Sequence, residues 1–563
     1  MINEKILENK TCKLCNSSFD ITDKDLEFYD KISPIFVGKK IQIPTPTFCS
    51  DCRQQRRLAW INESKLYRRL CDGTNKTMLL MYPEQTLYKV YSSEYWHSDK
   101  WDPMDYGIDI DFNQSFFKQM KELQLDVPRM GRSVLRLENS DYSNNASNLK
   151  DCYLSFNGGN AEKLFYCIGF KDSNNCIDCR IISSSDNCYE CIDCSKCYNL
   201  LYGESCEDVQ DSKYIKNCNS CSFCFACTNL NNKKYCIENI KYTKEEYEKL
   251  IKELSKKYSK EKFKNFCSKT YIKFIQFRHS DNVIGDYISN SKNVYYSFNI
   301  NDGEDVRYSY DLTGGSKDVM DVTQFGWGIS NILDSISVGI QSSNLLFCYQ
   351  TYENCSYLIY CDSCISCKNC LFCVSLRNKE YCIFNKQYTK EEYKKLALKT
   401  LTTMNKDNEW GEFFPFGNSP FFYNETQAIQ YFPLTKYEAL EKGFNWQDLK
   451  QEYPEVKKVI LAKKLPNDIK NIPDDILNRA IECEITKKIF RITKGELEFY
   501  RKHNLPIPKR HPDQRNLDRL EQMNPRKLYD RACDNCKKEI KTTYSPKRPE
   551  IIYCEDCYNK EIY

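Results

Sequence analysis

Eight cysteines near the two ends of the chain have the spacing of metal ligands. They form a pair of C-x2-C motifs at each end: Cys12, Cys15, Cys49 and Cys52, then Cys533, Cys536, Cys554 and Cys557. Zinc prefers four thiolates in a tetrahedron, and a C-x2-C turn presents two of them on one side of the ion. The pattern predicts two zinc ions per chain. Both should be structural, because an all-cysteine set leaves no open position for catalysis.

Arginines near these motifs predict contacts with nucleic acid. The stretch "RQQRRLAWINESKLYRRL" after Cys52 is predicted to be a helix, and a helix at the second ligand pair is typical of a treble-clef finger. Basic side chains on such modules would bind phosphates without reading a base sequence. The expected contacts are Arg53, Arg56, Arg57, Arg68, Arg69, Arg515, Arg519, Arg526 and Arg531. A solvated basic face without a partner is the alternative.

Each end of the chain is predicted to hold two fingers, one of which has lost its ligands. The stretch from Lys65 aligns without gaps with the stretch from Lys527, and the stretch from Cys12 matches the stretch from Cys483. The replaced ligand positions are Thr74, Ser92 and Tyr95 beside the surviving Cys71, and Thr486, His511 and Gln514 beside the surviving Cys483. Because the hydrophobic frame is kept while the ligands are lost, we expect the degenerate fingers to serve as scaffold.

A third group of cysteines predicts the central architecture. Between Asn148 and Cys236, fourteen cysteines fall in one reading frame of three, and several recur 21 residues apart, as Cys167 and Cys188 do. The regular return of one residue type indicates a chain wound in coils. We therefore expect a β-solenoid.

The solenoid is predicted to be duplicated. The cysteines from Cys218 to Cys236 recur 146 residues later, from Cys364 to Cys382, and each set is followed by the capping box of a helix, at Thr243 and Thr389. In the first halves of the two copies, valine, isoleucine or serine replaces cysteine: Cys152 aligns with Val294, Cys167 with Ser309, Cys176 with Val319, Cys179 with Val322, Cys188 with Ile332, Cys191 with Ser335 and Cys194 with Val338. Valine cannot ligate a metal, so the central thiols are predicted to be buried core.

The alternative for the central cysteines is an iron–sulfur cluster or zinc at Cys188, Cys191, Cys194 and Cys197. Their spacing is C-x2-C-x2-C-x2-C, whereas the bacterial ferredoxin run is C-x2-C-x2-C-x3-C-P. The third interval is therefore one residue too short, and the proline is missing.

Composition sets limits on the whole chain. Its 563 residues are too many for one core, and 33 cysteines with 41 tyrosines are far above ordinary usage. The net charge of +4 gives no global attraction to nucleic acid. No signal peptide or membrane-spanning run is visible, so we expect a cytoplasmic protein whose cysteines are reduced.

We expect a mainly β protein with short helices, in six segments. They are an amino-terminal two-finger module (1–96), an aromatic and helical connector (97–147), a first β-solenoid repeat with a capping helix (148–275), a second such repeat (276–400), an aromatic connector (401–475) that seats the carboxyl module against the solenoid, and a carboxyl-terminal two-finger module (476–563).

The sequence resembles uncharacterised cysteine-rich proteins with several zinc ribbons or treble clefs, encoded in small bacterial genomes. The resemblance is carried by "IPTPTFCSDCRQQRRL", "SDKWDPMDYG", "EWGEFFPFGNSPF" and "NPRKLYDRACDNCKKEIKTTYSPKRPEIIYCEDCY". It implies a fold and no established activity. In that family the second amino-terminal finger keeps its cysteines, so Thr74, Ser92 and Tyr95 are a departure.

These observations predict a zinc-binding scaffold that is not an enzyme and binds DNA or RNA through its basic modules. A protein-interaction scaffold is the first alternative, and a redox or metal-handling protein using the central cysteines is the second. We expect no membrane partner and identify no small-molecule substrate. Only four histidines occur, and neither they nor a glycine-rich phosphate loop forms a catalytic pattern.

Overall fold

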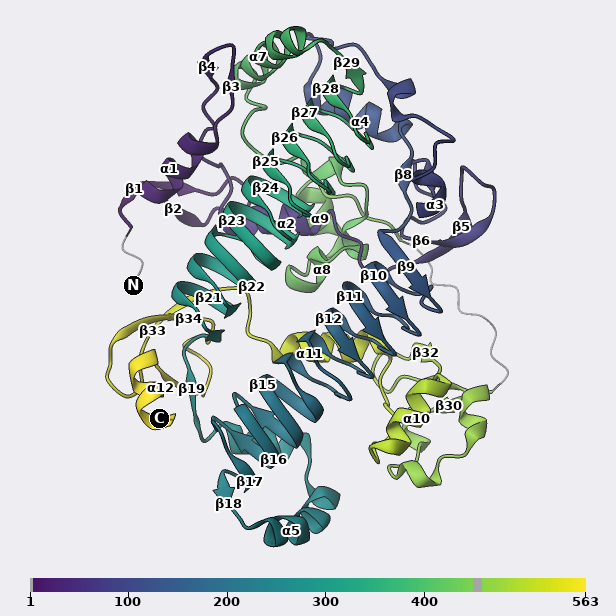
Figure 1. The fold of residues 1–563 in the computed structure, drawn as a ribbon, viewed down its shortest axis with the longest axis vertical. Helices are drawn as coiled ribbons and strands as arrows, with labels where there is room; N and C mark the ends of the chain where they lie inside the picture. The colour runs from purple at the N-terminus through teal and green to yellow at the C-terminus, as the bar shows by residue number, and fades with distance from the viewer. Residues whose placement is uncertain (1–3, 449–457, 563) are drawn as a thin grey trace. The chain divides into compact units, whose positions relative to one another are not determined.

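The computed structural model describes residues 4–448 and 458–562, and the part of the expected 401–475 connector between these ranges lies outside the described residues. The chain forms two compact units, each made of two separate stretches of sequence. The first comprises Met1–Arg132 and Ile275–Gln447, and the second comprises Ser133–Phe274 and Asp448–Tyr563. The prediction of a mainly β chain with a duplicated solenoid is confirmed (Figure 1).

The solenoid of the second unit is the first solenoid in sequence order. It is a stack of parallel strands that begins at Val134, inside the stretch assigned to the 97–147 connector. Ten strands make its sheet: β9 (Val134–Glu138), β10 (Asn144–Lys150), β11 (Phe156–Glu162), β12 (Ile168–Asn174), β13 (Arg180–Ser183), β14 (Ile192–Ser195), β15 (Tyr198–Lys216), β16 (Asn219–Thr228), β17 (Lys234–Ile237) and β18 (Ile240–Lys241). The last strand pairs antiparallel and leads into helix α5 (Lys244–Lys257), which Thr243 caps with the expected capping box.

The solenoid of the first unit, which is the second solenoid in sequence order, repeats this design. Its strands are β20 (Phe277–Arg278), β21 (Asp281–Ser289), β22 (Lys292–Arg307), β23 (Tyr310–Phe325), β24 (Ser330–Val338), β25 (Ser343–Leu346), β26 (Ser356–Ile359), β27 (Lys368–Leu371), β28 (Glu380–Ile383) and β29 (Lys386–Gln387). Helix α7 (Lys390–Lys406), capped by Thr389 and Glu392, closes the stack.

The coil is shorter than the 21-residue recurrence suggested. Asn144 pairs with Phe156, and Phe156 with Ile168, so one coil of the first solenoid takes twelve residues. In the second solenoid some coils take thirteen, since Lys317 pairs with Ser330 and Ser330 with Ser343. The 21-residue spacing is a multiple of the true three-residue unit, and it joins cysteines in different interior columns of the coil.

The reading frame of three arises from the backbone. Along the first solenoid nearly every third residue has a positive φ, for example Asn175 at 48° and Asp178 at 57°, and the residue that follows points inward. Asparagine and aspartate tolerate this left-handed conformation better than other residues. Many of them also bond from coil to coil, as Asn148 does by donating to Asn160 at 2.8 Å.

The inward positions form the core of each solenoid. In the first they are mostly cysteine, and in the second valine, isoleucine and leucine share the same core with cysteine. The predicted exchange of cysteine for valine in a buried column is confirmed, since Cys176 and Val319 are both 0% exposed. Cysteine suits the site because it is small and its S–H reaches nearby backbone carbonyls, such as that from Cys194 to Ile192 at 3.4 Å.

The amino-terminal module packs on the solenoid of its own unit. Its first finger contains β1 (Ile6–Thr11), β2 (Ser18–Thr22), α1 (Asp23–Ile32), β3 (Ile35–Phe36), β4 (Lys39–Lys40) and α2 (Ser50–Leu58), and its second contains β5 (Tyr67–Leu70), β6 (Thr77–Leu80), β7 (Val90–Tyr91) and α3 (Ser93–Trp96). The expected long helix ends at Leu58, because the chain turns at Asn62, whose side chain bonds the backbone of Lys65. Arg68 and Arg69 therefore lie on a strand.

Connecting segments fill the space beside this module. Helix α4 (Phe116–Asp126) is capped by Ser115, and it is followed by β8 (Arg129–Met130). Short helices α8 (Ala428–Tyr431) and α9 (Lys436–Glu441) follow α7, and Thr435 caps α9.

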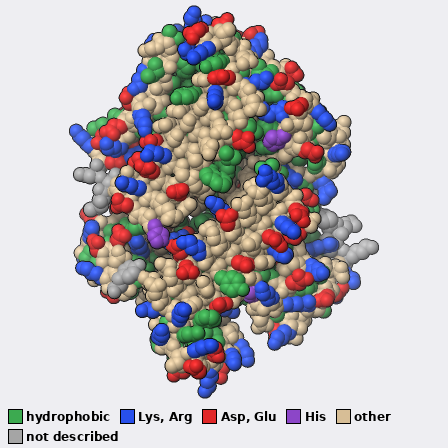
Figure 2. All heavy atoms as spheres, viewed as in Figure 1, with side chains coloured by type: hydrophobic (Ala, Val, Ile, Leu, Met, Phe, Trp, Pro, Cys, Tyr) green, Lys and Arg blue, Asp and Glu red, His purple; other side chains and the backbone are tan. Residues whose placement is uncertain are grey.

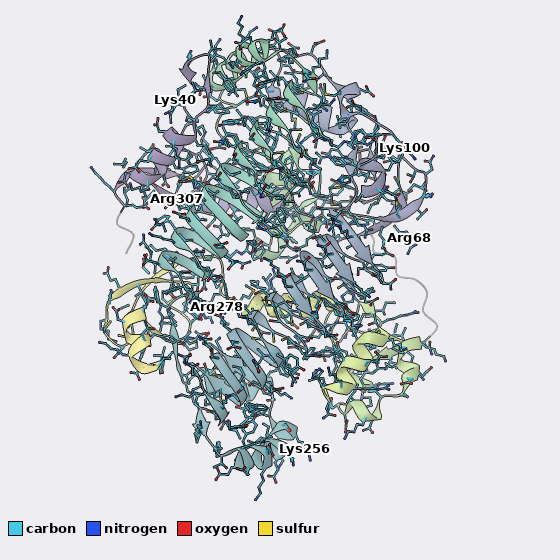
Figure 3. The ribbon with its side chains drawn as sticks, in the orientation of Figure 1. Lys40, Arg68, Lys100, Lys256, Arg278 and Arg307 are labelled. Atoms are coloured by element: carbon cyan, nitrogen blue, oxygen red, sulfur yellow. The ribbon has the colours of Figure 1, made fainter. Side chains whose placement is uncertain are left out.

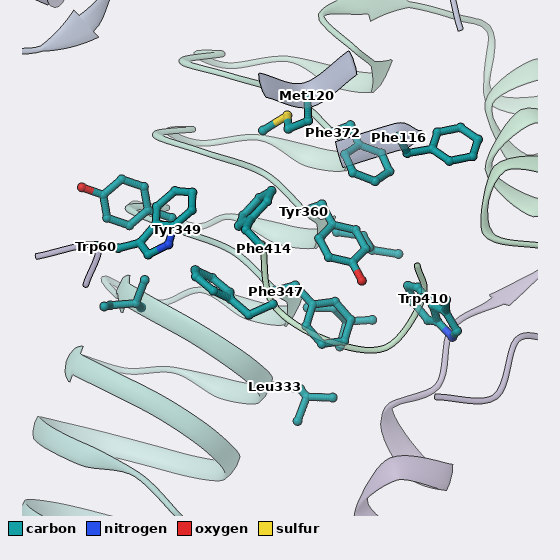
Figure 4. Packing of buried hydrophobic residues seen from close by; sticks show 14 of the residues in the cluster. Trp60, Phe116, Met120, Leu333, Phe347, Tyr349, Tyr360, Phe372, Trp410 and Phe414 are labelled. Carbon is teal, nitrogen blue, oxygen red and sulfur yellow. The ribbon is translucent and has the colours of Figure 1, made fainter. Parts of the chain in front are cut away.

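The expectation that the 401–475 connector seats the carboxyl module is wrong for its described part up to Gln447, which packs on the amino module. Trp60 stacks on Phe414 at 5.0 Å between ring centroids and meets Phe413 and Tyr349 edge-on (Figure 4). Aromatic side chains match many partners, so the composition of this segment did not specify which module it covers.

The carboxyl-terminal module packs on the first solenoid, within the second unit. Its first finger contains β30 (Val459–Leu461), β31 (Ala480–Glu482), β32 (Ile489–Phe490), α10 (Lys494–Lys502) and α11 (Pro512–Gln522). Its second contains β33 (Tyr529–Ala532), β34 (Glu539–Thr542), β35 (Ile551–Tyr553) and α12 (Glu555–Ile562), and β35 pairs with β19 (Tyr271–Lys273). Each finger module thus packs on the solenoid that is farther from it in the sequence.

Candidate metal centres

The amino-terminal cysteines converge as four metal ligands. Cys12 follows β1, and Cys49 and Cys52 lie at the start of α2. The sulfur atoms of these three cysteines and of Cys15 lie within 4.8 Å of one another, and the sulfurs of Cys15 and Cys49 are 3.7 Å apart. Metal–sulfur bonds of about 2.3 Å in a tetrahedron would place the sulfurs about 3.8 Å apart, so the set fits one ion.

The carboxyl-terminal cysteines form the same arrangement. Cys533, Cys536, Cys554 and Cys557 lie within 4.8 Å of one another, with the sulfurs of Cys536 and Cys554 at 3.6 Å. The finger was expected to be a ribbon, but α12 begins directly after Cys554 and carries Cys557, so it resembles the first finger in ending on a helix. Both sites bury three cysteines and expose one, Cys15 or Cys536.

The surroundings of the sulfurs favour a thiolate in each set. A hydrogen bond from the Cys52 thiol lowers the pKa of Cys49 to about 5. Burial opposes ionisation of Cys533, but backbone N–H groups of Cys554 and Cys536 outweigh it and bring the pKa of Cys533 to about 6. The pKa values of Cys52 and Cys554 are raised instead, so one thiolate in each set is favoured before a metal binds, and the remaining ligands would lose their protons on binding.

The degenerate amino-terminal finger keeps the backbone of a metal knuckle. The Ser92 N–H lies 3.1 Å from the Cys71 sulfur, as the Cys554 N–H lies 3.2 Å from the Cys533 sulfur. Gly73 makes room for Tyr95, since a Cβ at Gly73 would lie 2.5 Å from the Tyr95 ring. The ring therefore packs where the aligned finger has its fourth ligand.

The degenerate carboxyl-terminal finger uses its ligand positions differently. The Cys483 sulfur accepts from the Thr486 N–H at 3.4 Å. Nδ1 of His511 accepts from the Asp513 N–H at 3.1 Å and so caps α11. Within residues 4–448 and 458–562, the two all-cysteine sets are the groups of three or more cysteine, histidine or acidic side chains that could hold an ion.

The central cysteines, including Cys188, Cys191, Cys194 and Cys197, do not converge in this way. All four are at most 2% exposed and line the interior of the first solenoid. This environment suits a packed core better than a metal cluster.

The arginines of α2 are enclosed against the second solenoid. Arg53 donates to Asp321 at 2.9 Å and Arg57 to the other oxygen of Asp321 at 3.2 Å. Arg57 and Arg56 share Asp334, at 2.7 and 3.0 Å. These three arginines are at most 4% exposed.

The arginines of α11 make the same contacts in the second unit. Arg515 and Arg519 both bind Asp178, the latter at 2.7 Å, and all three side chains are buried. In the alignment of the two modules Arg53 and Arg57 correspond to Arg515 and Arg519, and Asp321 corresponds to Asp178. We call each of these clusters an arginine lock.

The arginine locks correct the expected phosphate contacts. A guanidinium that is buried and paired with aspartate is not presented to a nucleic acid, so Arg53, Arg56, Arg57, Arg515 and Arg519 hold the modules to the solenoids instead. Arg69 is buried and bonds Asp72 at 3.0 Å. Arg526 is half-buried, and Arg531 is half-buried beside Asp534 at 3.5 Å. Arg68 is exposed on β5 (Figure 3).

Sequence reasoning missed the acidic side of the locks. Asp178 and Asp321 each precede an inward residue, Cys179 or Val322, which the alignment of the two solenoid copies already pairs. The available signal was an aspartate that is identical in the two solenoid copies, whereas the residues beside it differ between the copies.

Comparison with known proteins does not assign the chain to a family. No family model and no curated protein matches the chain. One similar crystal structure, of a protein from Desulfovibrio desulfuricans G20 assigned as an acetyltransferase, has 9% identity and a TM-score of 0.10. The match covers 43% of this chain and 63% of that one, and a likeness of this size carries no argument. Among the described residues, no helix has the length and apolar character needed to cross a bilayer.

Proposed function

We propose that the protein is a scaffold without catalytic activity, in which zinc at the two all-cysteine sites folds the finger modules that hold two β-solenoids. The donor set supports zinc, because four thiolates in a closed tetrahedron are typical of structural zinc sites. It also supports the absence of catalysis at these sites, since a set of four cysteines leaves no ligand position for a substrate or water.

One observation carries the proposal: a metal ligand and an arginine lock share one short helix. Cys52 lies in α2 directly before Arg53, and Arg57 follows one turn later. A metal at Cys49 and Cys52 would fix the start of α2 and, through it, the position of both guanidinium groups. Metal binding and packing on the solenoid are therefore coupled in the first unit.

The locks weaken the case for nucleic acid as the partner. The locks use five of the nine expected arginine contacts, and the face seen in Figure 2 mixes Lys and Arg with Asp and Glu without a broad basic patch. We therefore propose that partners meet the solenoid walls and that phosphate binding through α2 and α11 is not the function.

Metal removal tests the proposal with a control inside the chain. The lock of the second unit lies on α11, in the finger that has lost its ligands, so it should survive chelation. Hydrogen exchange with and without a zinc chelator should show faster exchange in α2 (Ser50–Leu58) and little change in α11 (Pro512–Gln522).

Two results would contradict the coupling. Unchanged protection of α2 after the metal is removed would show that the metal does not support the lock. Equal loss of protection in α2 and α11 would show general unfolding instead of the local release that we propose.

A further inference from the structure

A polar groove runs along one corner of the second solenoid. It has a volume of about 960 Å³ and crosses four successive coils. Small residues form its floor and exposed polar residues form its two walls. The floor is Ser280, Ser291, Gly303 and Ser316, and the walls include Asn290, Asp302 and Gly315 on one side and Lys292, Glu304 and Lys317 on the other.

The floor consists of serine and glycine, whose side chains are small, and two of its serine hydroxyls already make hydrogen bonds. The Ser291 hydroxyl accepts from the Gly303 N–H at 2.9 Å, and the Ser316 hydroxyl donates to the Gly326 carbonyl at 2.7 Å. A ligand would therefore bond to the walls. Since neighbouring coils lie about 4.8 Å apart, the walls offer polar groups at a regular interval along the solenoid axis.

An aromatic side chain lies beside the groove. Trp327 is 53% exposed, which is unusual for the largest apolar side chain. Its ring lies over Gly314, where a Cβ would be 3.0 Å from the indole, and Gly314 adjoins Gly315 in the groove wall. Gly314 and Gly315 have φ of 119° and 77°, a backbone that a bulkier residue would strain.

The coil that carries Trp327 is one residue longer in the second solenoid than in the first. Val322 aligns with Cys179 and Ile332 with Cys188, so the second copy has one residue more in this interval, which contains Trp327. This extra residue makes the coil from Lys317 to Ser330 thirteen residues long, and other coils of this solenoid, such as that from Ser330 to Ser343, are also thirteen residues long. A coil can fold without this extra residue, because the corresponding coil of the first solenoid lacks it.

We infer that this groove binds a neutral polysaccharide, with one sugar ring against Trp327. An indole gives the apolar face of a sugar ring a flat surface to pack on, and the walls supply donors and acceptors for its hydroxyls. The charges argue against a polyanion, because Asp281, Asp302 and Glu304 outnumber Lys292 and Lys317, and Glu304 pairs with Lys317 at 3.0 Å. The inference goes beyond the scaffold role and does not depend on the metal sites.

Native affinity electrophoresis of the full chain tests this inference. Gels would contain soluble glucans, mannans or xylans, and a parallel series would contain heparin or single-stranded DNA. We expect retardation by at least one neutral polysaccharide that changes little with salt. Trp327→Ala should weaken it about tenfold, because the stacked ring is lost. Tyr357→Ala is the matched control, since Tyr357 is a similarly exposed aromatic (59%) on β26 of the same solenoid, three coils beyond the groove residue Lys317.

The outcomes are distinct. Retardation that Trp327→Ala weakens and Tyr357→Ala does not would support the groove. Absence of retardation by every neutral polysaccharide would overturn the inference, as would equal retardation of the two variants. Binding to heparin or DNA alone, weakening with salt, would overturn the ligand class. None of these results would change the metal-dependence of α2.

Discussion

The carboxylate of Asp321 sits between two guanidinium groups in a site closed to water. Arg53 and Arg57 bind its two oxygens, and Asp321 is 1% exposed. Removing one partner of a buried ion pair leaves the remaining charge uncompensated, which costs far more than the pair itself contributes. The locks are therefore positions where a single substitution should have a large effect.

We expect Asp321→Asn to destabilise the first unit by about 3–5 kcal/mol, because Arg53 would lose its counter-charge and Arg57 would keep only Asp334. Chemical denaturation followed by tryptophan fluorescence measures this change in the free energy of unfolding. Asp30→Asn is the control, since Asp30 pairs with Lys40 at 2.5 Å on the surface and should matter little. If the two variants proved equally stable, the lock would not hold the module.

His503 provides a pH-dependent contribution to the stability of the second unit. Its ring packs on Phe499 at 4.4 Å, and burial, aided by Lys502, lowers its pKa from 6.5 to about 4. The unfolded chain takes up a proton near pH 6.5, whereas the folded chain does not until near pH 4. Stability from this group is therefore present above pH 6.5 and is lost as the pH falls toward 4.

We expect the melting temperature of His503→Gln to fall less between pH 7 and pH 5 than that of the unmodified protein. Protonation of the metal-binding cysteines affects both proteins alike and cancels in the comparison. Identical pH profiles would show that His503 does not titrate in this way.

At the scale of elements, one finger fold persists with and without its ligands. The knuckle of Cys71 repeats the backbone bonds of the knuckle of Cys533, such as the bond from Cys71 N–H to Lys76 at 2.9 Å and from Cys533 N–H to Lys538 at 2.8 Å. The degenerate finger also keeps the strand pairing that docks it, because β7 pairs with β8 as β35 pairs with β19. The degenerate finger therefore keeps the docking contact of the finger that has its ligands.

The retained knuckle should accept a metal again. We expect the triple variant Thr74→Cys, Ser92→Cys and Tyr95→Cys to bind one more zinc ion than the unmodified chain, because its backbone repeats the hydrogen bonds of the Cys533 knuckle. Elemental analysis measures the gain, and alanine at the same three positions is the control. An unchanged zinc content would mean that the finger has lost the geometry as well as the ligands.

The elements differ in how far the sequence predicts them. Local patterns succeeded: the three-residue frame predicted a solenoid, and the capping boxes at Thr243 and Thr389 placed both closing helices. Properties that depend on distant contacts did not follow, because the partner of Arg53 lies 268 residues away. The coil length was also hidden, since every multiple of three fits the cysteine frame equally well.

At the scale of the whole molecule, both units follow one plan. Each combines a two-finger module, the solenoid farther from it in sequence, an arginine lock and a strand pair that joins the second finger to a strand just before the other solenoid. The repeated plan indicates duplication of the complete arrangement. It also means that cutting the chain between the two solenoids would divide both units.

The central claim is that the eight terminal cysteines bind metal while the solenoid cysteines form a core. Native mass spectrometry of the full chain counts the bound ions directly. We predict two zinc ions, one in Cys52→Ser and one in Cys557→Ser, and still two in Cys194→Val, which copies Val338 of the second solenoid. More than two ions in the unmodified chain, or a loss of metal in Cys194→Val, would contradict the account.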